Sequence, residues 1–183
     1  VIHHDEKSKQ GQNQWHSDVT WRQEPSLGSI LRARTVPPVG GDTLFADMMA
    51  AYENLSEELR EQIEGATAIH SFEHNFGRRM APEKRAEFLE QYPPARHPVV
   101  RTHPETGKKA LYVSRPFTTH IEGLEAEESF SLLRKLYRQA TIPEHQVRFR
   151  WRENSVAFWD NRSVQHYAAF DYWPHTRRVE RVT

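Results

Sequence analysis

The C-terminal third of the sequence consists of short runs in which polar and apolar residues alternate, and this pattern restricts the fold more than any other feature. Turn-forming clusters such as Asp160-Asn161-Arg162 separate the runs. Short strands at this spacing are typical of a β-sandwich or a β-barrel. We therefore predict a mainly β fold, a double-stranded β-helix (jelly-roll, cupin-like) barrel with accessory helices outside it and with Trp151 and Trp159 in its core. The expected strands here are 146–151, 155–159, 164–170 and 177–183.

The preceding two thirds of the chain mix strands with helices. A strand from Gly28 to Val36 ends at the turn-forming pair Pro37-Pro38. Ser56 is the expected N-cap of a helix that ends at Gly65, because a serine side chain accepts a hydrogen bond from the first helical turn. The segment 67–72 is ambiguous between strand and helix. The other expected elements are a strand at 43–46, helices at 47–54, 82–92 and 124–140, and a hairpin of strands 97–103 and 108–114.

Length and charge exclude several classes of protein. The 183 residues suffice for one domain with a substantial core, and we expect residues 1–183 to form a single domain. Lys plus Arg and Asp plus Glu both number 25, so the chain lacks the basic excess of proteins that bind nucleic acids or membrane surfaces. The sequence contains neither an apolar run of membrane-spanning length nor an initial signal-peptide pattern. We therefore expect no nucleic-acid or membrane partner and a cytoplasmic location.

Both ends of the chain suggest a longer protein. The first residue is a valine rather than a methionine, and residues 179–183 stop within a strand-like alternation. We expect that an N-terminal portion and a short C-terminal tail are missing from this chain.

The chain has no cysteine, so any metal site must use histidine, aspartate and glutamate. The stretch WHSDVTW (15–21) places His16 and Asp18 two residues apart. On a strand, such residues project from the same face, and an imidazole and a carboxylate would converge. A His-x-Asp triplet also arises by chance, and alone it is more often a hydrogen-bonded polar pair. A third ligand would complete the two-histidine, one-carboxylate site of non-haem iron oxygenases, and His166 is the best candidate for it, although a histidine beside aromatic residues is also common in a core.

Arg177 and Arg181 are four residues apart in the last strand-like run, so with Val179 they share one face. Two inward guanidinium groups need anionic partners, because an unpaired buried charge is costly. Guanidinium pairs well with carboxylate or sulfonate-like groups. A solvated edge strand rich in arginine explains the spacing equally well. Thr43 ends the turn Gly40-Gly41-Asp42-Thr43 and begins the expected strand 43–46. Its hydroxyl could contact such an anion, although a plain turn is the simpler interpretation.

The sequence resembles the Fe(II)/2-oxoglutarate-dependent taurine dioxygenase family. The resemblance extends in family order across nearly the whole chain, which makes it highly specific. It implies an enzyme that uses Fe(II), 2-oxoglutarate and O2 to hydroxylate a small acidic, sulfonate-like substrate, with taurine as one option, and that releases succinate and CO2. The matching stretches are WHSDVTW, GGDTLFADMMAAYENLS, HPVVRTHPETGKKALYVSRPFTTHI, QVRFRW and AFWDNRSVQHYAAFDYWPHTRRVERVT.

The resemblance also implies which residues bind the metal and the cosubstrate. His16, Asp18 and His166 would be the iron ligands and thus the catalytic centre. Thr43 and Arg177 would hold the distal carboxylate of 2-oxoglutarate.

The same resemblance implies the contacts of the substrate. Arg181 and the backbone amide of Val19 would face its acidic group. Phe76 and Phe117 would line its pocket. Gln12 falls where taurine-type enzymes have an asparagine near the substrate amine.

Other interpretations remain open. Gln12 and the pair Arg115-Pro116 depart from the taurine pattern, so the same chemistry on an alkyl sulfate, an aryloxyacetate or another small carboxylate is the close alternative. A cupin-like zinc hydrolase or zinc-dependent binding module would use the same three ligands, because Zn²⁺ accepts histidine and aspartate with a water in the fourth position. Such a protein has no need for an anchor formed by Thr43 and Arg177. Assembly into a homo-oligomer is left open.

Overall fold

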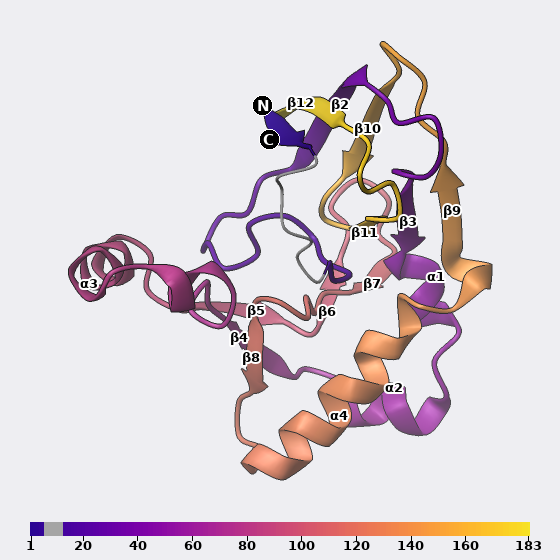
Figure 1. Ribbon diagram of the computed structural model, residues 1–183. Coiled ribbons are helices and arrows are strands. Elements are labelled where there is room, and N and C mark those ends of the chain that lie inside the picture. The colour runs from indigo at the N-terminus through magenta and orange to yellow at the C-terminus, as the bar shows by residue number, and fades with distance from the viewer. Residues whose placement is uncertain (6–12) are drawn as a thin grey trace.

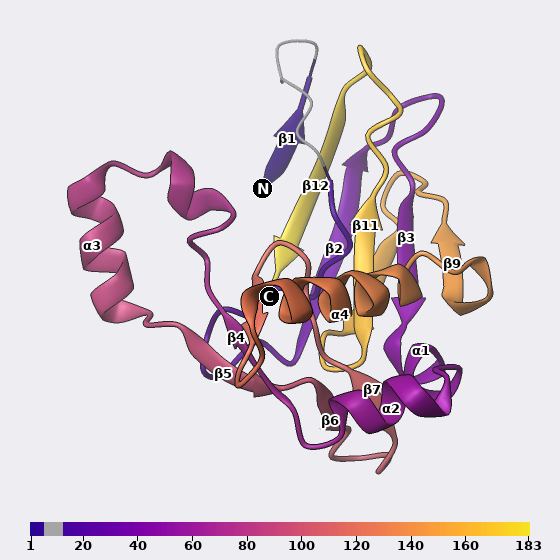
Figure 2. The ribbon, with the colours of Figure 1, turned by 90° about the horizontal axis from the view of Figure 1, so that it is seen from below.

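The computed structural model describes residues 1–5 and 13–183, and its centre is a pair of β-sheets (Figure 1). The strands in both sheets pair antiparallel. Seen from below, they stand side by side, with β1 at one margin and β9 at the other (Figure 2). The prediction of a mainly β fold is confirmed. The first sheet has the order β1 (Ile2–His4), β12 (Arg177–Val182), β2 (Gly28–Thr35) and β10 (Val156–Asp160), and the second has the order β11 (Val164–Ala168), β3 (Thr43–Asp47) and β9 (Gln146–Phe149).

A hydrophobic cluster joins the two sheets. Leu31 of β2 and Val179 of β12 are buried in it, and Phe45 of β3 packs against it from the other sheet. The ring centroids of Phe45 and Trp159 are 5.2 Å apart. Trp151 is buried in the same cluster, so the prediction that both tryptophans lie in the core is confirmed. Burial of each aliphatic side chain of this kind contributes roughly 1.5–3 kcal/mol, which makes the cluster a main source of stability for the sheet pair.

Helices α1 (Met48–Glu53), α2 (Glu57–Ile63) and α4 (Ala126–Gln139) lie below the sheets in Figure 1, and the short 3₁₀ helix η2 (Pro143–His145) follows α4. Ser56 caps α2 as predicted, because its Oγ accepts a hydrogen bond from the Leu59 amide at 3.3 Å. Helix α4 falls within the predicted range 124–140. It buries Leu132, Leu133 and Leu136 in a core that it shares with α1.

A smaller sheet extends the molecule to one side, followed by a helix at the left of Figure 1. The expected hairpin of 97–103 and 108–114 is shorter than predicted, because β5 pairs with β4 and only β6 and β7 pair with each other. Pro98 lacks the amide hydrogen that would continue one ladder through this segment. The elements of this region are β4 (Thr67–His70), the 3₁₀ helix η1 (Phe76–Arg79), α3 (Pro82–Gln91), β5 (Ala95–Pro98), β6 (Val100–Thr102), β7 (Lys109–Leu111) and β8 (Thr118–Ile121), with the sheet order β5-β4-β8.

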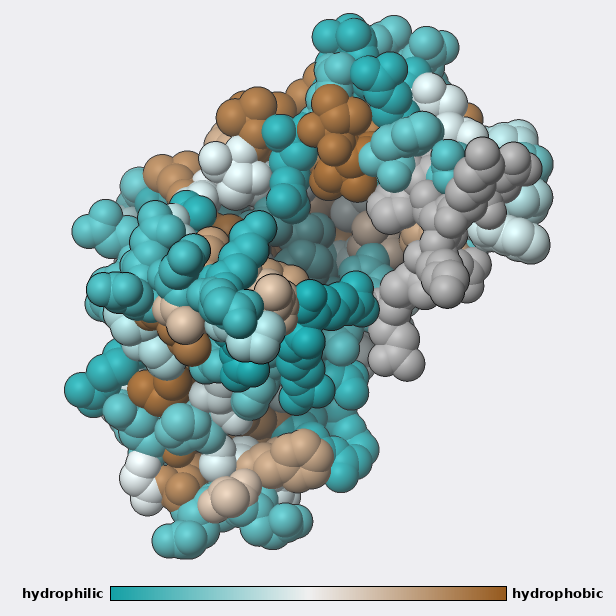
Figure 3. Space-filling view, turned by 60° about the vertical axis from the view of Figure 1, so that its left-hand side comes forward, coloured by the Kyte–Doolittle hydropathy of each residue, from teal (hydrophilic) through white to brown (hydrophobic). Residues whose placement is uncertain are grey.

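The surface is mixed in character. Figure 3 shows one face as largely hydrophilic around a central hollow, with hydrophobic side chains gathered above it. On the first sheet, Ile30 is exposed and pairs with two other exposed apolar residues, Phe158 and Val182. Within residues 1–5 and 13–183, no helix is both long and apolar enough to cross a membrane.

Candidate metal centre

His16, Asp18 and His166 come together where the segment before β2 meets strand β11. One ligand atom from each residue lies within 4.8 Å of the other two. A β-bridge pairs the histidines: the His16 amide donates to the His166 carbonyl at 3.2 Å, and the His166 amide donates to the His16 carbonyl at 2.8 Å. The imidazole centroids are 4.2 Å apart, and Nε2 of His16 is 3.8 Å from Oδ1 of Asp18. The structure thus brings together the three residues that were predicted from the sequence.

Asp18 reaches its partners by a route that differs from the prediction. Only His16 pairs as a strand residue, whereas Asp18 begins a turn in which the Arg22 amide donates to the Val19 carbonyl at 3.0 Å. Val19 has a φ of 48°, a left-handed conformation that β-branched residues rarely adopt. The prediction of a shared strand face was therefore wrong. The turn, not strand alternation, directs the carboxylate toward His16.

Asn161, in the turn between β10 and β11, holds Asp18 in place. Its side-chain oxygen accepts a hydrogen bond from the Asp18 amide at 2.6 Å, and its side-chain nitrogen donates to the Asp18 carbonyl at 2.7 Å. Asn161 is 1% exposed, so these bonds are shielded from water. The sequence indicated only a turn at this position, because nothing local reveals that Asn161 pairs with a residue 143 positions away.

Further hydrogen bonds orient the ligand side chains. Nδ1 of His16 lies 2.7 Å from the Gln14 carbonyl, which favours the proton on Nδ1 and leaves the Nε2 lone pair for a metal. The Ser29 hydroxyl donates to Oδ2 of Asp18 at 2.7 Å, so that Oδ1 is the oxygen turned toward His16. Nδ1 of His166 is buried and has no hydrogen-bond partner among the described residues. Neither Ser29 nor Gln14 carried a signal in the sequence.

The electrostatics of the cluster favour metal binding. Burial, reinforced by the neighbouring His16, lowers the pKa of His166 to about 3, and burial also lowers the pKa of His16. Burial alone would raise the pKa of Asp18, but His166, Arg181 and His16 outweigh it, and the pKa is lowered. The histidines are therefore neutral and the aspartate is ionised. These are the protonation states in which such side chains bind a metal.

The donor set fits a first-row divalent cation. Two imidazoles and one carboxylate on one side of a metal leave other positions open, the pattern of Fe(II) oxygenase sites. The free lone pair of His16 and the unpartnered ring nitrogen of His166 show that both rings have coordination capacity to spare.

A cavity of about 300 Å³ opens beside the cluster. Arg177 lines it, is 5% exposed and donates from Nε to the Gly41 carbonyl at 3.0 Å. Its Nη2 is buried and has no partner among the described residues. Oγ1 of Thr43 accepts a hydrogen bond from Nε1 of Trp151 at 3.0 Å, so the hydroxyl proton is free to donate. An unpaired guanidinium nitrogen in the same wall as a hydroxyl donor can bind a carboxylate. The wall includes His16, His166, Thr43, Arg177 and Arg181.

Arg181 is the second arginine of β12 in this cavity. Its Nη1 is 3.1 Å from Oδ1 of Asp18, and its side chain is 36% exposed. Arg177 and Val179 are buried, so the predicted inward face of the strand is confirmed for both. The alternative interpretation of this segment as a wholly solvated edge strand is therefore wrong.

The two predicted phenylalanines lie at different depths. Phe117 is 7% exposed, with its ring centroid 6.3 Å from that of His16. It lines a second cavity, of about 510 Å³, whose wall also includes His16. Phe76 packs behind it in an aromatic cluster, with ring centroids 5.7 Å from Trp21 and 5.4 Å from Phe72. Phe76 belongs to the wall of neither cavity.

The other two predicted substrate contacts are the Val19 amide and Gln12. The Val19 amide donates no hydrogen bond to another described residue. Gln12 lies outside the described residues.

Comparison with known proteins adds independent information. The family model described as taurine catabolism dioxygenase TauD, TfdA family matches residues 2–183. An alpha-ketoglutarate-dependent sulfate ester dioxygenase of Pseudomonas putida is 40% identical over 183 residues, covering 95% of this chain and 60% of the relative. An alpha-ketoglutarate-dependent sulfonate dioxygenase of Saccharomyces cerevisiae is 37% identical over 174 residues, covering 92% of this chain and 41% of the relative.

A solved structure resembles the fold closely. The crystal structure of a taurine dioxygenase from Burkholderia xenovorans has a TM-score of 0.77 and 41% sequence identity, covering 91% of this chain and 55% of that chain. The chain spans about half the length of the curated relatives that it matches.

Proposed function

The chain belongs to the taurine catabolism dioxygenase TauD, TfdA family, and from this membership we propose that it is an Fe(II)- and 2-oxoglutarate-dependent dioxygenase. One observation carries the proposal: a single cavity wall holds His16 and His166 together with Arg177 and Thr43, and Asp18 completes the cluster beside the two histidines. The cosubstrate 2-oxoglutarate has a keto acid that binds metals and a second carboxylate that needs an anchor. The cavity offers both kinds of contact.

In this proposal, His16, Asp18 and His166 hold the iron. Arg177 and Thr43 receive the distal carboxylate of 2-oxoglutarate through the free Nη2 and the free hydroxyl proton, because hydrogen bonds to a carboxylate are strengthened by charge. When bound, the iron and 2-oxoglutarate supply the oxidising chemistry, in which O2 and 2-oxoglutarate are consumed, succinate and CO2 are released, and one oxygen atom enters a C–H bond of the substrate.

Aromatic rings pack against both histidines of this site and cover part of their surface. Trp159 packs on His166 with ring centroids 4.9 Å apart, and Phe45 lies 6.4 Å from the same imidazole. Phe117 covers His16 from the side of the second cavity. Exclusion of water strengthens the electrostatic contacts within a site and limits side reactions.

The proposed substrate is a small molecule with an acidic group, a sulfonate or a sulfate, and an aryloxyacetate is the alternative. Arg181, assisted by the Val19 amide, is the proposed contact of the acidic group. Phe117 walls the pocket, and Phe76 supports it from behind. The contact of Gln12 with the substrate stays a prediction. Hydroxylation of the carbon that bears a sulfonate or sulfate gives an unstable product, which separates into an aldehyde and sulfite or sulfate.

Three wider proposals accompany this function. The two sheets close into a double-stranded β-helix barrel, a shape supported by the hydrophobic cluster that they share. Residues 1–183 act as one catalytic domain. The protein works in the cytoplasm, since a chain without cysteine has no disulfide that would need an oxidising compartment.

The test is succinate release by purified protein supplied with Fe(II), 2-oxoglutarate, O2 and a panel of sulfonates, alkyl sulfates and aryloxyacetates. We expect substrate-dependent succinate with at least one class. Without O2, Fe(II) and 2-oxoglutarate should give a weak visible charge-transfer band that is lost in His16→Ala. The control is His120→Ala, because His120 is exposed and lies outside both cavities. A band of full strength in His16→Ala would contradict the ligand assignment.

A second variant separates the two arginines. Arg177→Ala should raise the 2-oxoglutarate concentration needed for half-maximal rate far more than the substrate concentration. The opposite order would mean that Arg181 anchors the cosubstrate. A zinc hydrolase would show neither the band nor any dependence on 2-oxoglutarate.

A further inference from the structure

His16 lies between two cavities of different chemistry. The first contains Thr43, Arg177 and Arg181, which the proposed function assigns to 2-oxoglutarate and to the acidic group of the substrate. The second, of about 510 Å³, has a use that the proposed function leaves undefined beyond Phe117. Its described wall contains three guanidinium groups and no carboxylate. The lining residues are Asn13, Gln14, His16, His74, Asn75, Arg78, Arg79, Arg115, Pro116 and Phe117.

The turn that carries Arg115 is fixed by hydrogen bonds. The amides of Phe117 and Thr118 donate to the Ser114 carbonyl at 2.9 and 2.7 Å, and the Ser114 amide donates to Oγ1 of Thr118 at 2.8 Å. The following Pro116 also restricts the backbone of Arg115. Because Pro116 and Phe117 are buried while Arg115 is exposed, the turn holds the base of this arginine still and leaves its guanidinium accessible.

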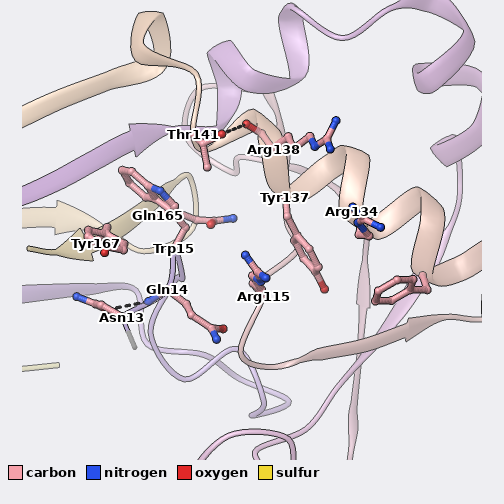
Figure 4. Close-up of a pocket in the computed structure, with 11 residues that line it drawn as sticks. Asn13, Gln14, Trp15, Arg115, Arg134, Tyr137, Arg138, Thr141, Gln165 and Tyr167 are labelled. Atoms are coloured by element: carbon pink, nitrogen blue, oxygen red, sulfur yellow. Dashed lines mark hydrogen bonds between the residues drawn. The ribbon is translucent and has the colours of Figure 1, made fainter. Parts of the chain in front are cut away.

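Arg115 stands where the second cavity borders a third cavity, which lies beside α4. The two cavities share Asn13, Gln14 and Arg115. Figure 4 shows Arg115 between Gln14 and Tyr137, with Arg134 and Arg138 further along the helix. The positive character of this side of the metal centre is therefore continuous.

Arg78 and Arg79 reach the second cavity from η1. This short helix is pressed against the aromatic cluster: the Gly77 amide donates to the Phe72 carbonyl at 3.2 Å, and a Cβ on Gly77 would lie 3.0 Å from the Phe72 ring. The Met80 amide closes the helix by donating to the Gly77 carbonyl at 3.2 Å. The two arginines thus project from a fixed backbone.

None of these three arginines forms an ion pair with a described residue. Arg85 and Arg96, which lie in the same part of the chain, are paired with Glu73 and Glu122. Like charges that share one wall without counter-charges create a positive potential that attracts anions, and the concave shape of a cavity concentrates this field. The wall is therefore built to receive negative charge.

We propose that the second cavity is a subsite for a distal anion of the substrate, formed by Arg115, Arg78 and Arg79. The preferred substrates then carry a sulfonate, sulfate or carboxylate at each end, one for Arg181 and one for this subsite, with the oxidised carbon held between them at the metal centre. The inference rests on the proposed function and narrows its substrate class from small acids to molecules with two terminal anionic groups.

The test compares butanesulfonate with a butane that carries a sulfonate at each end. Binding is measured by calorimetry to the protein loaded with Fe(II) and 2-oxoglutarate in the absence of O2, so the readout does not depend on turnover. We expect the disulfonate to bind about tenfold more tightly, a difference of about 1.4 kcal/mol. Arg115→Gln should remove most of this preference, and the double variant R78Q/R79Q should reduce it further, while the affinity for butanesulfonate stays the same.

The matched control is Arg134→Gln, because Arg134 is exposed, lies on α4 and does not line the second cavity. This variant should keep the full preference. Equal affinity for the two ligands, binding of neither, or an equal loss in Arg134→Gln and Arg115→Gln would overturn the subsite. Succinate release with the panel of single-anion substrates decides the proposed function separately, so a failure of one proposal is distinguishable from a failure of the other.

Discussion

Two pairs of histidines with neighbouring rings differ in what surrounds them. The rings of His16 and His166 are 4.2 Å apart, and those of His70 and His97 are 5.0 Å apart. Burial lowers the pKa of all four imidazoles. A buried neutral histidine pair is therefore no sign of a metal site by itself.

The difference lies in the partners of the ring nitrogens. Nδ1 of His70 is 3.0 Å from the Thr20 hydroxyl, its Nε2 is 3.2 Å from the Thr118 hydroxyl, and Nε2 of His97 is 2.9 Å from the Arg22 carbonyl. These nitrogens are occupied by hydrogen bonds, and neither His70 nor His97 lines the two cavities beside the metal centre.

The other pair has unsatisfied nitrogens, a carboxylate and an open cavity. Nδ1 of His166 has no partner among the described residues, and Oδ1 of Asp18 lies beside Nε2 of His16. Buried polar groups without partners are costly, so a pair left in this state implies a function that compensates for the cost. Spare coordination capacity thus separates a site from a core.

The largest expected effect comes from removing one ligand. His166→Ala should reduce Fe(II) affinity and succinate release by more than the roughly 100-fold that outer partners of a metal site contribute. Metal affinity is measured by competition with a colorimetric chelator. His97→Gln removes an imidazole of the other pair and should leave metal affinity within about twofold of wild type, a small change on the scale of outer-partner effects. Equal losses in both variants would remove the distinction between the pairs.

The next effect concerns the support of Asp18. Asn161→Ala deletes the bonds to the Asp18 amide and carbonyl, so the turn should loosen and Fe(II) affinity should fall about 10–100-fold, the range seen for outer partners of metal ligands. Asn161→Asp keeps the acceptor for the amide and should recover part of the loss. An unchanged affinity in Asn161→Ala would show that Asp18 needs no such support.

Much of this arrangement was predictable from local pattern. Strands β2, β3 and β9 to β12, the helix α4 and the Ser56 cap follow alternation, periodicity and capping, which depend on neighbouring residues. The three candidate ligands could also be named from the sequence, because their chemistry is visible in the residue types, and the structure brings them together. Their role as ligands stays a prediction. What failed was the strand at His16 and Asp18, since the turn there depends on Asn161, which is distant in sequence and near only after folding.

Other errors have the same origin. The sequence placed one long hairpin at 97–114, but β5 pairs with β4, a strand whose own pattern was ambiguous. The pairing of distant strands is decided by tertiary packing, to which a local pattern is blind. Nothing in the sequence indicated that Ser29 contacts Asp18 or that Arg115 shares a cavity wall with Arg78 and Arg79, because these are contacts between separate elements.

The dependence of the free energy of unfolding on pH should report on the hydrogen-bonded pair of His70 and His97. Burial lowers the pKa of His70 from its ordinary value of 6.5 to about 3. Below pH 6.5 the unfolded chain takes up a proton that the folded chain refuses, so the free energy of unfolding falls as the pH drops toward 3, by up to about 1.4 kcal/mol per pH unit for one group. Urea unfolding of the metal-free protein at pH 7 and pH 5 measures this slope, which should be smaller in His70→Gln. Stability that is flat or rises on acidification would contradict the neutral state of this buried histidine.

The smallest expected effects come from removing one hydroxyl group beside each histidine pair. Ser29 donates to Oδ2 of Asp18 in the metal-free protein as well, so only the change in this hydrogen bond on metal binding, about 1 kcal/mol, affects the affinity, and Ser29→Ala should lower Fe(II) affinity only about fivefold. Thr118 contacts His70 and also accepts from the Ser114 amide, so Thr118→Val leaves a buried donor without a partner and should destabilise the fold by about 1–3 kcal/mol. Ser29→Ala should therefore change the chelator competition, and Thr118→Val should change the urea unfolding. A loss of metal affinity in Thr118→Val equal to that in Ser29→Ala would mean that the two histidine pairs are coupled, because the hydroxyl of one pair would then act on the ligands of the other.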